Sequence, residues 1–227
     1  MGTSNTLVSC HLQVLALALA VTAGTGCVAT THDDVDNDVP ARETDGVAFK
    51  GNCDCPAPCQ VVLTGGQTAP YQGTNGPDVI CVGDDHDYTI YGNGGADVIC
   101  GGGGDDHLYG GDGLDTILGG GGDDEIAGGN DKDWLYGCDG HDTLDGEYGP
   151  DELHGGPGDD TLLGGAGDDE LHAGPGLDQL IGGPGDDELY GSCSDSNTLD
   201  GGGDSDDCHI GPFDGSANCE STPNLSC

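Results

Sequence analysis

The chain has 227 residues, of which 47 are glycine, and 43 acidic side chains stand against 3 basic ones, which gives a formal net charge of −40. Such a polyanion is repelled at every contact with nucleic acid, so nucleic acid is excluded as a partner. With aromatic residues at 4%, the composition lies nearer to disordered chains than to compact domains. The charge must be balanced by ions from solution, and multivalent cations are the expected partners.

Residues 1–26 contain no Asp, Glu, Lys or Arg, and the apolar run "HLQVLALALAVTAGTG" within them ends in small residues. This pattern predicts a secretory signal segment, since the run is too short for a membrane-spanning helix. Cys27 follows "AGTG", a sequence similar to the box in which bacterial lipoproteins are cleaved and lipidated, although Gly24 stands where an aliphatic residue is usual. Two alternatives stay open, plain cleavage and a membrane tether through lipidated Cys27. Either predicts a secreted or cell-surface protein, in the second case anchored to a bacterial outer membrane.

Residues 27–50 are acidic and polar and predict a disordered linker. Ten cysteines remain when Cys10 and Cys27 are set aside, and an even number in an exported chain favours disulfides. The stretch "CDCPAPC", with Cys53, Cys55 and Cys59, also suggests a metal knot, but no companion cluster at zinc spacing follows it. We therefore expect residues 51–72 to form a small disulfide-containing cap, in which "CQVVLTG" contributes one short strand.

A nine-residue repeat, G-G-x-G-x-D-x-U-x with U a large aliphatic residue, begins at Gly73. One unit spans Gly73–Cys81, Val82 is inserted, and twelve further units run without a break from Gly83 to Tyr190. The sixth position is Asp in all units except the second, which has Tyr88. The eighth position is always aliphatic: Ile80, Ile90, Ile99, Leu108, Ile117, Ile126, Leu135, Leu144, Leu153, Leu162, Leu171, Leu180 and Leu189.

The frame continues in altered form to residue 210. Residues 191–200 keep Leu199, and residues 201–209 keep Asp206 but place Cys208 in the aliphatic column. Residues 211–227 lack the pattern and are expected to form a C-terminal cap or tail, in which Cys208 and Cys219 close a loop.

The repeat predicts an all-β fold. The glycines of each unit allow positive φ and a tight turn, and its last three residues are extended with the aliphatic side chain on one face. Two units then complete one coil of a right-handed parallel β-roll (solenoid) over residues 73–210, in which every eighteenth residue stacks about 4.8 Å above its predecessor. Stacking also gathers the sixth-position carboxylates into two columns of like charge. Calcium suits such columns because it accepts about six to eight oxygen ligands in flexible geometry.

These residues resemble the RTX, or haemolysin-type calcium-binding, repeat. The resemblance implies a β-roll that binds multiple Ca²⁺ ions through the Asp side chains and glycine-turn carbonyls of neighbouring turns. It assigns as metal ligands Asp78, Asp97, Asp106, Asp115, Asp124, Asp133, Asp142, Asp151, Asp160, Asp169, Asp178 and Asp187. The second unit departs from the pattern, with His86 for a glycine and Tyr88 for the Asp, and Asp87 is an alternative ligand there. Asp131 stands where glycine is usual, in a conformation that Asp adopts at modest cost.

The core of the predicted roll is a single file of Ile and Leu, which cannot balance the conformational entropy of so many glycines. We therefore expect the metal-free roll not to fold and calcium binding to supply the missing free energy. No H-E-x-x-H or G-x-S-x-G motif is present, and the repeats leave no room for a catalytic domain, so no enzyme is expected.

The ninth positions are expected to face outward. One sheet then displays Cys81, Cys100, Leu118, Tyr136, His154, His172 and Tyr190, and Cys81 and Cys100 pair either with each other or with the cap cysteines. The ladder from Tyr136 to Tyr190 is interpreted as ring stacking on an exposed sheet, with a binding strip or a transition-metal site as alternatives. The sequence thus predicts an extracellular calcium-binding repeat protein, and the alternative is an adhesin-like module that binds a carbohydrate or protein partner.

Overall fold

The computed structural model describes residues 55, 59–65, 69–192, 195–212 and 214–219, together with two short strands that pair antiparallel, β1 (Glu43–Thr44) and β2 (Val47–Ala48). The predicted signal segment, Cys27 and most of the acidic linker lie outside these residues. Within the part of the chain that is described, no helix has the length and apolar character needed to cross a membrane.

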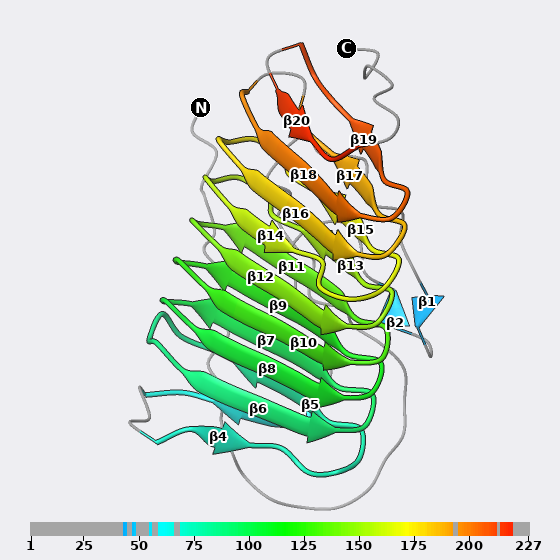
Figure 1. Ribbon diagram of the computed structural model, residues 1–227. Helices are drawn as coiled ribbons and strands as arrows, with labels where there is room; N and C mark the ends of the chain where they lie inside the picture. Colours follow the sequence, from blue (N-terminus) through cyan, green and yellow to red (C-terminus); the bar gives the residue numbers. More distant parts are fainter. Residues whose placement is uncertain are drawn as a thin grey trace, which may run out of the picture. The chain divides into compact units, whose positions relative to one another are not determined.

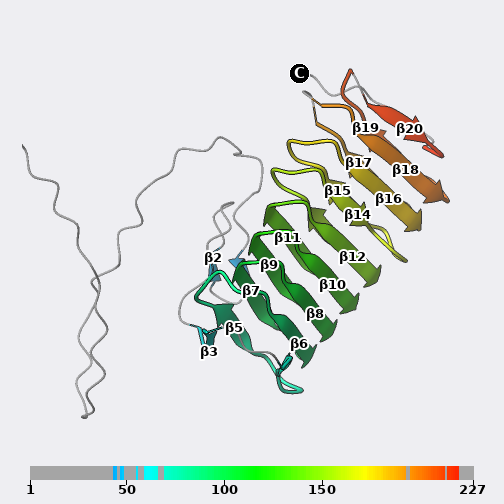
Figure 2. The same cartoon turned by 90° about the vertical axis from the view of Figure 1, so that its left-hand side faces the viewer.

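Two nine-stranded sheets make up the roll, and every pair of neighbouring strands in them is parallel (Figure 1, Figure 2). The odd sheet contains β3 (Val61–Leu63), β5 (Val79–Val82), β7 (Val98–Gly103), β9 (Thr116–Gly121), β11 (Trp134–Asp139), β13 (Glu152–His154), β15 (Glu170–His172), β17 (Glu188–Tyr190) and β19 (Asp207–His209). The even sheet contains β4 (Tyr71–Gln72), β6 (Thr89–Gly94), β8 (His107–Asp112), β10 (Glu125–Asn130), β12 (Thr143–Tyr148), β14 (Thr161–Leu163), β16 (Gln179–Pro184), β18 (Thr198–Gly203) and β20 (Gly215–Ala217). Since the chain alternates between the sheets, the predicted all-β parallel β-roll is confirmed.

The register of the strands follows the nonapeptide. Leu135 is paired with Leu153, eighteen residues on, so equal positions of the repeat stack and two units make one coil. Ile80 is paired with Ile99, nineteen residues on, because Val82 is inserted between them. The insertion is absorbed without a change of face, and the aliphatic residues therefore stay inside along the whole array.

The thirteen aliphatic residues of the eighth position are at most 1% exposed and lie between the sheets in two facing rows, one from each sheet. Leu63 of β3, Leu199 of β18 and Cys208 of β19 extend this core at its two ends. Cys208 is fully buried and forms a disulfide with Cys219, which confirms the loop expected at the C-terminal end. The predicted single file of Ile and Leu is therefore a double row, because successive units contribute their aliphatic residue to opposite sheets.

The turns depend on glycine where successive coils approach closely. At the fourth position, Gly140 has a φ of 152°, and a Cβ added there would overlap the carbonyl oxygen of Gly122 in the preceding coil. Asp131 stands at the same position of its own unit with a φ of 78°, so the prediction that Asp tolerates this place is confirmed. An L residue at positive φ is strained, and the turns confine that strain to few positions.

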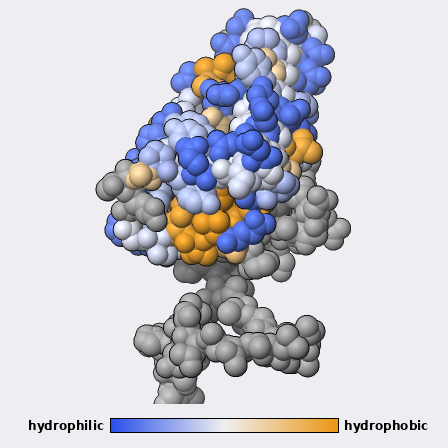
Figure 3. Space-filling model, turned by 90° about the horizontal axis from the view of Figure 1, so that it is seen from below, coloured by the Kyte–Doolittle hydropathy of each residue, from blue (hydrophilic) through white to orange (hydrophobic). Residues whose placement is uncertain are grey.

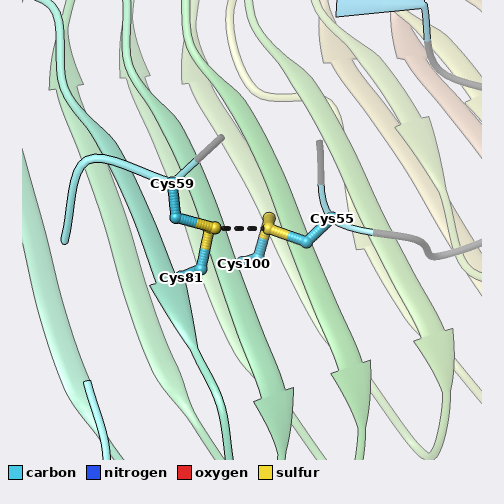
Figure 4. The surroundings of a disulfide bond; sticks show 4 residues. All are labelled: Cys55, Cys59, Cys81 and Cys100. Carbon is cyan, nitrogen blue, oxygen red and sulfur yellow. Dashed lines mark hydrogen bonds between the residues drawn. A yellow bond between two sulfur atoms is a disulfide. The ribbon is translucent and has the colours of Figure 1, made fainter. Parts of the chain in front are cut away.

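Two disulfides join the cap to the roll. Cys55 is bonded to Cys100 of β7 and Cys59 to Cys81 of β5 (Figure 4). Of the two pairings left open by the sequence, Cys81 and Cys100 therefore take cap cysteines as partners and not each other. Viewed from the β4 end, an apolar patch lies beside hydrophilic surface (Figure 3). Among the described residues, Val62 of β3 is one of the exposed large apolar side chains.

Candidate metal centre

The sixth-position aspartates form two columns, one in each row of turns. The odd column precedes the odd-numbered strands and contains Asp78, Asp97, Asp115, Asp133, Asp151, Asp169 and Asp187. The even column precedes the even-numbered strands and contains Asp106, Asp124, Asp142, Asp160 and Asp178. All twelve predicted ligands are buried, with relative exposures between 0% and 8%. The structure thus removes from water carboxylates that are ordinarily solvated.

One oxygen of these carboxylates ties successive coils together. The backbone N–H of Asp124 donates to Oδ1 of Asp142 in the next coil at 2.8 Å, and the N–H of Asp142 donates to Oδ1 of Asp160 at 2.9 Å. In the odd column, the N–H of Asp115 donates to Oδ1 of Asp133 in the same way, at 2.8 Å. Oδ1 therefore has a structural partner supplied by the roll itself.

The second oxygen, Oδ2, is buried without a hydrogen-bond partner among the described residues in eleven of the twelve predicted ligands. The exception is Asp78, whose Oδ2 accepts hydrogen bonds from the backbone N–H and the Oγ1 hydroxyl of Thr74, at 2.6 and 3.0 Å. The eleven are Asp97, Asp106, Asp115, Asp124, Asp133, Asp142, Asp151, Asp160, Asp169, Asp178 and Asp187. A buried polar atom left in this state costs about 1–3 kcal/mol, and more when it is charged.

Ten of these oxygens, all except that of Asp178, lie against the backbone of a first-position glycine. A Cβ built on Gly101 would lie 2.5 Å from Oδ2 of Asp106 and 2.5 Å from the carbonyl oxygen of Gly119 in the next coil. Glycine at this position therefore lets a carboxylate oxygen and a backbone carbonyl oxygen approach the same point beside its backbone. Ala173 takes the equivalent place in the sequence before Asp178.

Burial raises the pKa of these carboxyl groups, and neighbouring carboxylates add to the rise while the N–H bond to Oδ1 opposes it. The pKa reaches about 8 at Asp133 and Asp160. It is raised to about 7 at Asp106, Asp115, Asp124 and Asp187. It is raised to about 6 at Asp97, Asp142, Asp151, Asp169 and Asp178. Without a cation, the columns thus take up protons at a much higher pH than ordinary carboxyl groups, and at pH 7 Asp133 and Asp160 favour the protonated form.

The donors on offer are all oxygens, from carboxylates and backbone carbonyls. This set suits a hard cation, and calcium tolerates its mixed and irregular geometry better than magnesium, which demands a near-ideal octahedron. Zinc and copper favour nitrogen or sulfur ligands, so the columns are poorly matched to them.

The even column starts with a residue that is not acidic. Tyr88 is 3% exposed, its backbone N–H donates to Oδ1 of Asp106 at 2.7 Å, and its hydroxyl donates to Oδ1 of Asp84 at 3.1 Å. Asp87 is exposed, and its Oδ1 accepts the N–H of Asp105 in the outer part of the turn. The suggestion that Asp87 replaces the missing carboxylate in the column is therefore wrong.

Two residues that the sequence reasoning missed extend the even column at its other end. Oδ1 of Asn197 accepts the N–H of Asp178 at 2.9 Å, and the N–H of Asn197 donates to Oδ1 of Asp214, also at 2.9 Å. Asn197 lies two residues before Leu199, which is the spacing of the repeat, so counting back from the aliphatic residue identifies it. An amide thus makes the same Oδ1 contact as the carboxylates.

The outer face of the odd sheet carries the predicted ring ladder. Tyr136, His154, His172 and Tyr190 stack in order, and His209 of β19 continues the stack, with ring centroids 4.3–4.9 Å apart and interplanar angles of 2–7°. Nε2 of His172 lies 3.0 Å from Oε1 of Glu170, while burial lowers the pKa of the His172 imidazole. The interpretation of this ladder as ring stacking on a sheet is confirmed.

A comparison with protein families finds the RTX calcium-binding nonapeptide repeat in four copies, at residues 72–108, 109–144, 136–171 and 163–192. Together they span more than half of the chain. No curated protein matches the chain, and no solved structure matches it.

Proposed function

The chain belongs to the RTX calcium-binding nonapeptide repeat family, and from that premise we propose that calcium ions held in both columns fold its roll. We also propose that the protein is extracellular or attached to the cell surface and that it has no catalytic role. The observation that carries the proposal is the set of eleven buried Oδ2 atoms that the described residues leave without a hydrogen-bond partner.

The proposed ligands are the twelve sixth-position aspartates from Asp78 to Asp187, assisted by carbonyl oxygens of the neighbouring glycine turns. In eleven of the twelve, all except Asp78, Oδ1 is fixed by a backbone N–H, and in ten of these, all except Asp178, Oδ2 lies beside the backbone of a first-position glycine, as at Asp106 and Gly101. Asp78 has the weakest support, because Thr74 already donates two hydrogen bonds to its Oδ2.

Calcium, when bound, supplies positive charge that compensates the buried carboxylates. The residues of the chain orient the carboxylates and exclude water from them. The N–H bonds to Oδ1 orient each carboxylate, and the aliphatic rows keep water from the inner side of each column. Without that compensation, a column of ionised carboxylates destabilises the folded state through mutual repulsion and burial of charge. This supports a roll that folds only when calcium is bound.

Three disulfides among the described residues support a location in an oxidising compartment. Together with the apolar segment before Cys27, they support export by way of an N-terminal signal. We retain both plain cleavage and lipidation of Cys27 as proposals, and intact-mass measurement of the mature protein distinguishes them.

The adhesin-like alternative has weaker support from the geometry of the ladder. Sugars contact aromatic side chains mainly across the ring face, and in this stack the faces of His154 and His172 cover each other, with 4.5 Å between centroids. Only ring edges remain for a partner. The ladder therefore favours a structural role for these side chains.

Two single substitutions, one in the even column and one outside it, test the proposed ligands. Asp142→Asn in the even column replaces Oδ2 by an amide nitrogen and keeps Oδ1 as acceptor, the arrangement that Asn197 already has. Asp123→Asn is the matched control, because Asp123 is exposed and its Oδ1 accepts the N–H of His141 in the outer part of the turn.

We expect equilibrium dialysis with calcium to show fewer bound ions per chain for Asp142→Asn than for the wild type, and an unchanged number for Asp123→Asn. If Asp142→Asn binds as many ions with the same affinity as the wild type, the column is not the calcium site.

A further inference from the structure

Four cysteines from three separate parts of the sequence meet where the cap joins the odd sheet (Figure 4). Cys55 and Cys59 come from the cap, Cys81 from β5 and Cys100 from β7. The sulfur atoms of Cys55, Cys59 and Cys81 all lie within 4.8 Å of one another, and Cys100 is bonded to Cys55. Sγ of Cys55 and Sγ of Cys81 belong to different disulfides, yet they lie only 2.9 Å apart. The four sulfurs therefore form one cluster.

The roll brings two of these residues together through its register. Cys81 and Cys100 are direct partners in the pairing of β5 with β7, at the outward ninth position of successive coils on the odd sheet. The sequence shows no second pair at zinc spacing, because the two cysteines are nineteen residues apart, but the coil places them side by side. Cys55 and Cys59, separated by three residues, supply the short-spaced pair typical of structural zinc sites.

The surroundings of the cluster are apolar. Cys81 and Cys100 are each 4% exposed, and they pack with Leu118 and with the partly buried Val79 and Val98. Such a shell shields sulfur atoms from water and favours compact coordination over hydrated ions. It also separates the cluster from the carboxylate columns, whose donors are oxygens.

We propose that Cys55, Cys59, Cys81 and Cys100 form a second metal site, which binds a single Zn²⁺ through four thiolates when its two disulfides are reduced. The reductant is a dithiol. Each disulfide takes up two electrons and two protons to give two thiols, and each dithiol molecule is oxidised to its cyclic disulfide. Zinc then binds the four sulfurs and displaces their four protons to solvent.

The disulfide-bonded form and the zinc-bound form would both link the cap to the same two strands of the roll. In an oxidising compartment, the disulfides fasten Cys55 and Cys59 to β7 and β5. In a reducing compartment, where disulfides do not persist, the four thiolates fasten the same strands through the metal. Calcium does not compete for this site, since it binds sulfur poorly.

The experiment compares the full chain in its reduced and oxidised forms, both in excess calcium. Zinc uptake is measured by competition with a chromophoric chelator. Cobalt(II), substituted for zinc, reports thiolate ligation through its sulfur-to-metal charge-transfer absorption. The oxidised protein is the internal control, since it presents the same carboxylates and histidines. We expect the reduced protein to bind about one additional zinc ion per chain and to show tetrathiolate cobalt absorption.

Two variants locate the site. The pair Cys55→Ser/Cys59→Ser is expected to abolish the cobalt absorption, and the pair Cys208→Ser/Cys219→Ser, at the other end of the roll, is expected to retain it. Circular dichroism in calcium verifies that both fold. Equal zinc uptake by reduced and oxidised wild-type protein overturns the proposal, and so does thiolate absorption that survives in the Cys55/Cys59 variant.

Discussion

Each of the twelve predicted aspartate ligands other than Asp78 has two different carboxylate oxygens, one that joins the coils and one that lacks a hydrogen-bond donor among the described residues. Its Oδ1 accepts an N–H from the neighbouring coil, as between Asp142 and Asp124, and this bond holds the side chain in one orientation. Its Oδ2 is buried, beside a first-position glycine in all except Asp178, and has no hydrogen-bond donor among the described residues. The same side chain thus stabilises the coil-to-coil contact and raises the cost of folding without a cation.

Glycine in the turns is required by contact between coils, and this leads to a prediction. Gly140→Ala places a methyl group against the carbonyl oxygen of Gly122 at a φ of 152°. We expect it to lower the free energy of unfolding in saturating calcium by about 2 kcal/mol or more. Gly203→Ala is the control, since a Cβ there meets nothing within 4 Å, and we expect a change within about 0.5 kcal/mol. Denaturant unfolding of both variants measures the difference, and equal stabilities would contradict the account of the turns.

At the scale of strands and columns, the period of the repeat made most of the fold predictable. Two positions of the repeat set the inner face and the turn, the eighth always Ile or Leu and the sixth Asp in all units but one. A coil of two units follows from the need to bury Ile and Leu on both sheets. The register could therefore be read from residues such as Leu135 and Leu153, which the structure pairs directly.

The cysteine pairing and the two ends of the aspartate columns could not be predicted, because they depend on contacts that do not follow from the nine-residue period. The pairing of Cys59 with Cys81 was left open, because stacking alone places Cys100 equally near Cys81. Asn197 was missed since an inserted residue shifts the frame and an amide replaces the carboxylate. Thr74 was missed because its hydrogen bonds to Asp78 arise from the fold of the first turn. Departures from the repeat were thus the least predictable parts.

The raised pKa values of the columns predict an unusual pH dependence for the metal-free chain. Asp133 has a pKa of about 8 in the folded state against 3.8 in the unfolded state, so the folded state binds more protons between these values. The resulting stabilisation is fully present below pH 3.8 and is lost as the pH rises through about 6 to 8, the range spanned by the columns. Acid should therefore promote folding without calcium.

Far-ultraviolet circular dichroism of calcium-free protein, dialysed against metal-stripped buffer, measures this effect between pH 8 and pH 4. We expect the β signal to increase as the pH falls. Protein in excess calcium is the control and should show a constant signal between pH 6 and pH 8. A metal-free signal that is largest at pH 8 would contradict the assignment of the columns as the source of instability.

The whole chain carries a net charge of −40, and the core of its roll is narrow, with two rows of aliphatic side chains. Compact proteins normally balance chain entropy with a broad apolar core, which this roll lacks. Disulfides fasten both ends of the array, through Cys59–Cys81 and Cys208–Cys219, and Cys138 of β11 is also disulfide-bonded. None of these bonds offsets the charge of the buried carboxylates, so the coils still depend on its compensation.

The central claim is that calcium binding and folding of the roll are one coupled process. It is tested most directly by a calcium titration of the full-length oxidised protein at neutral pH, followed by calorimetry and circular dichroism in parallel. We predict that chelated protein lacks the β signal of the roll, that the signal appears in step with ion binding, and that several ions bind per chain. A chelated protein that keeps its full β signal would contradict the account.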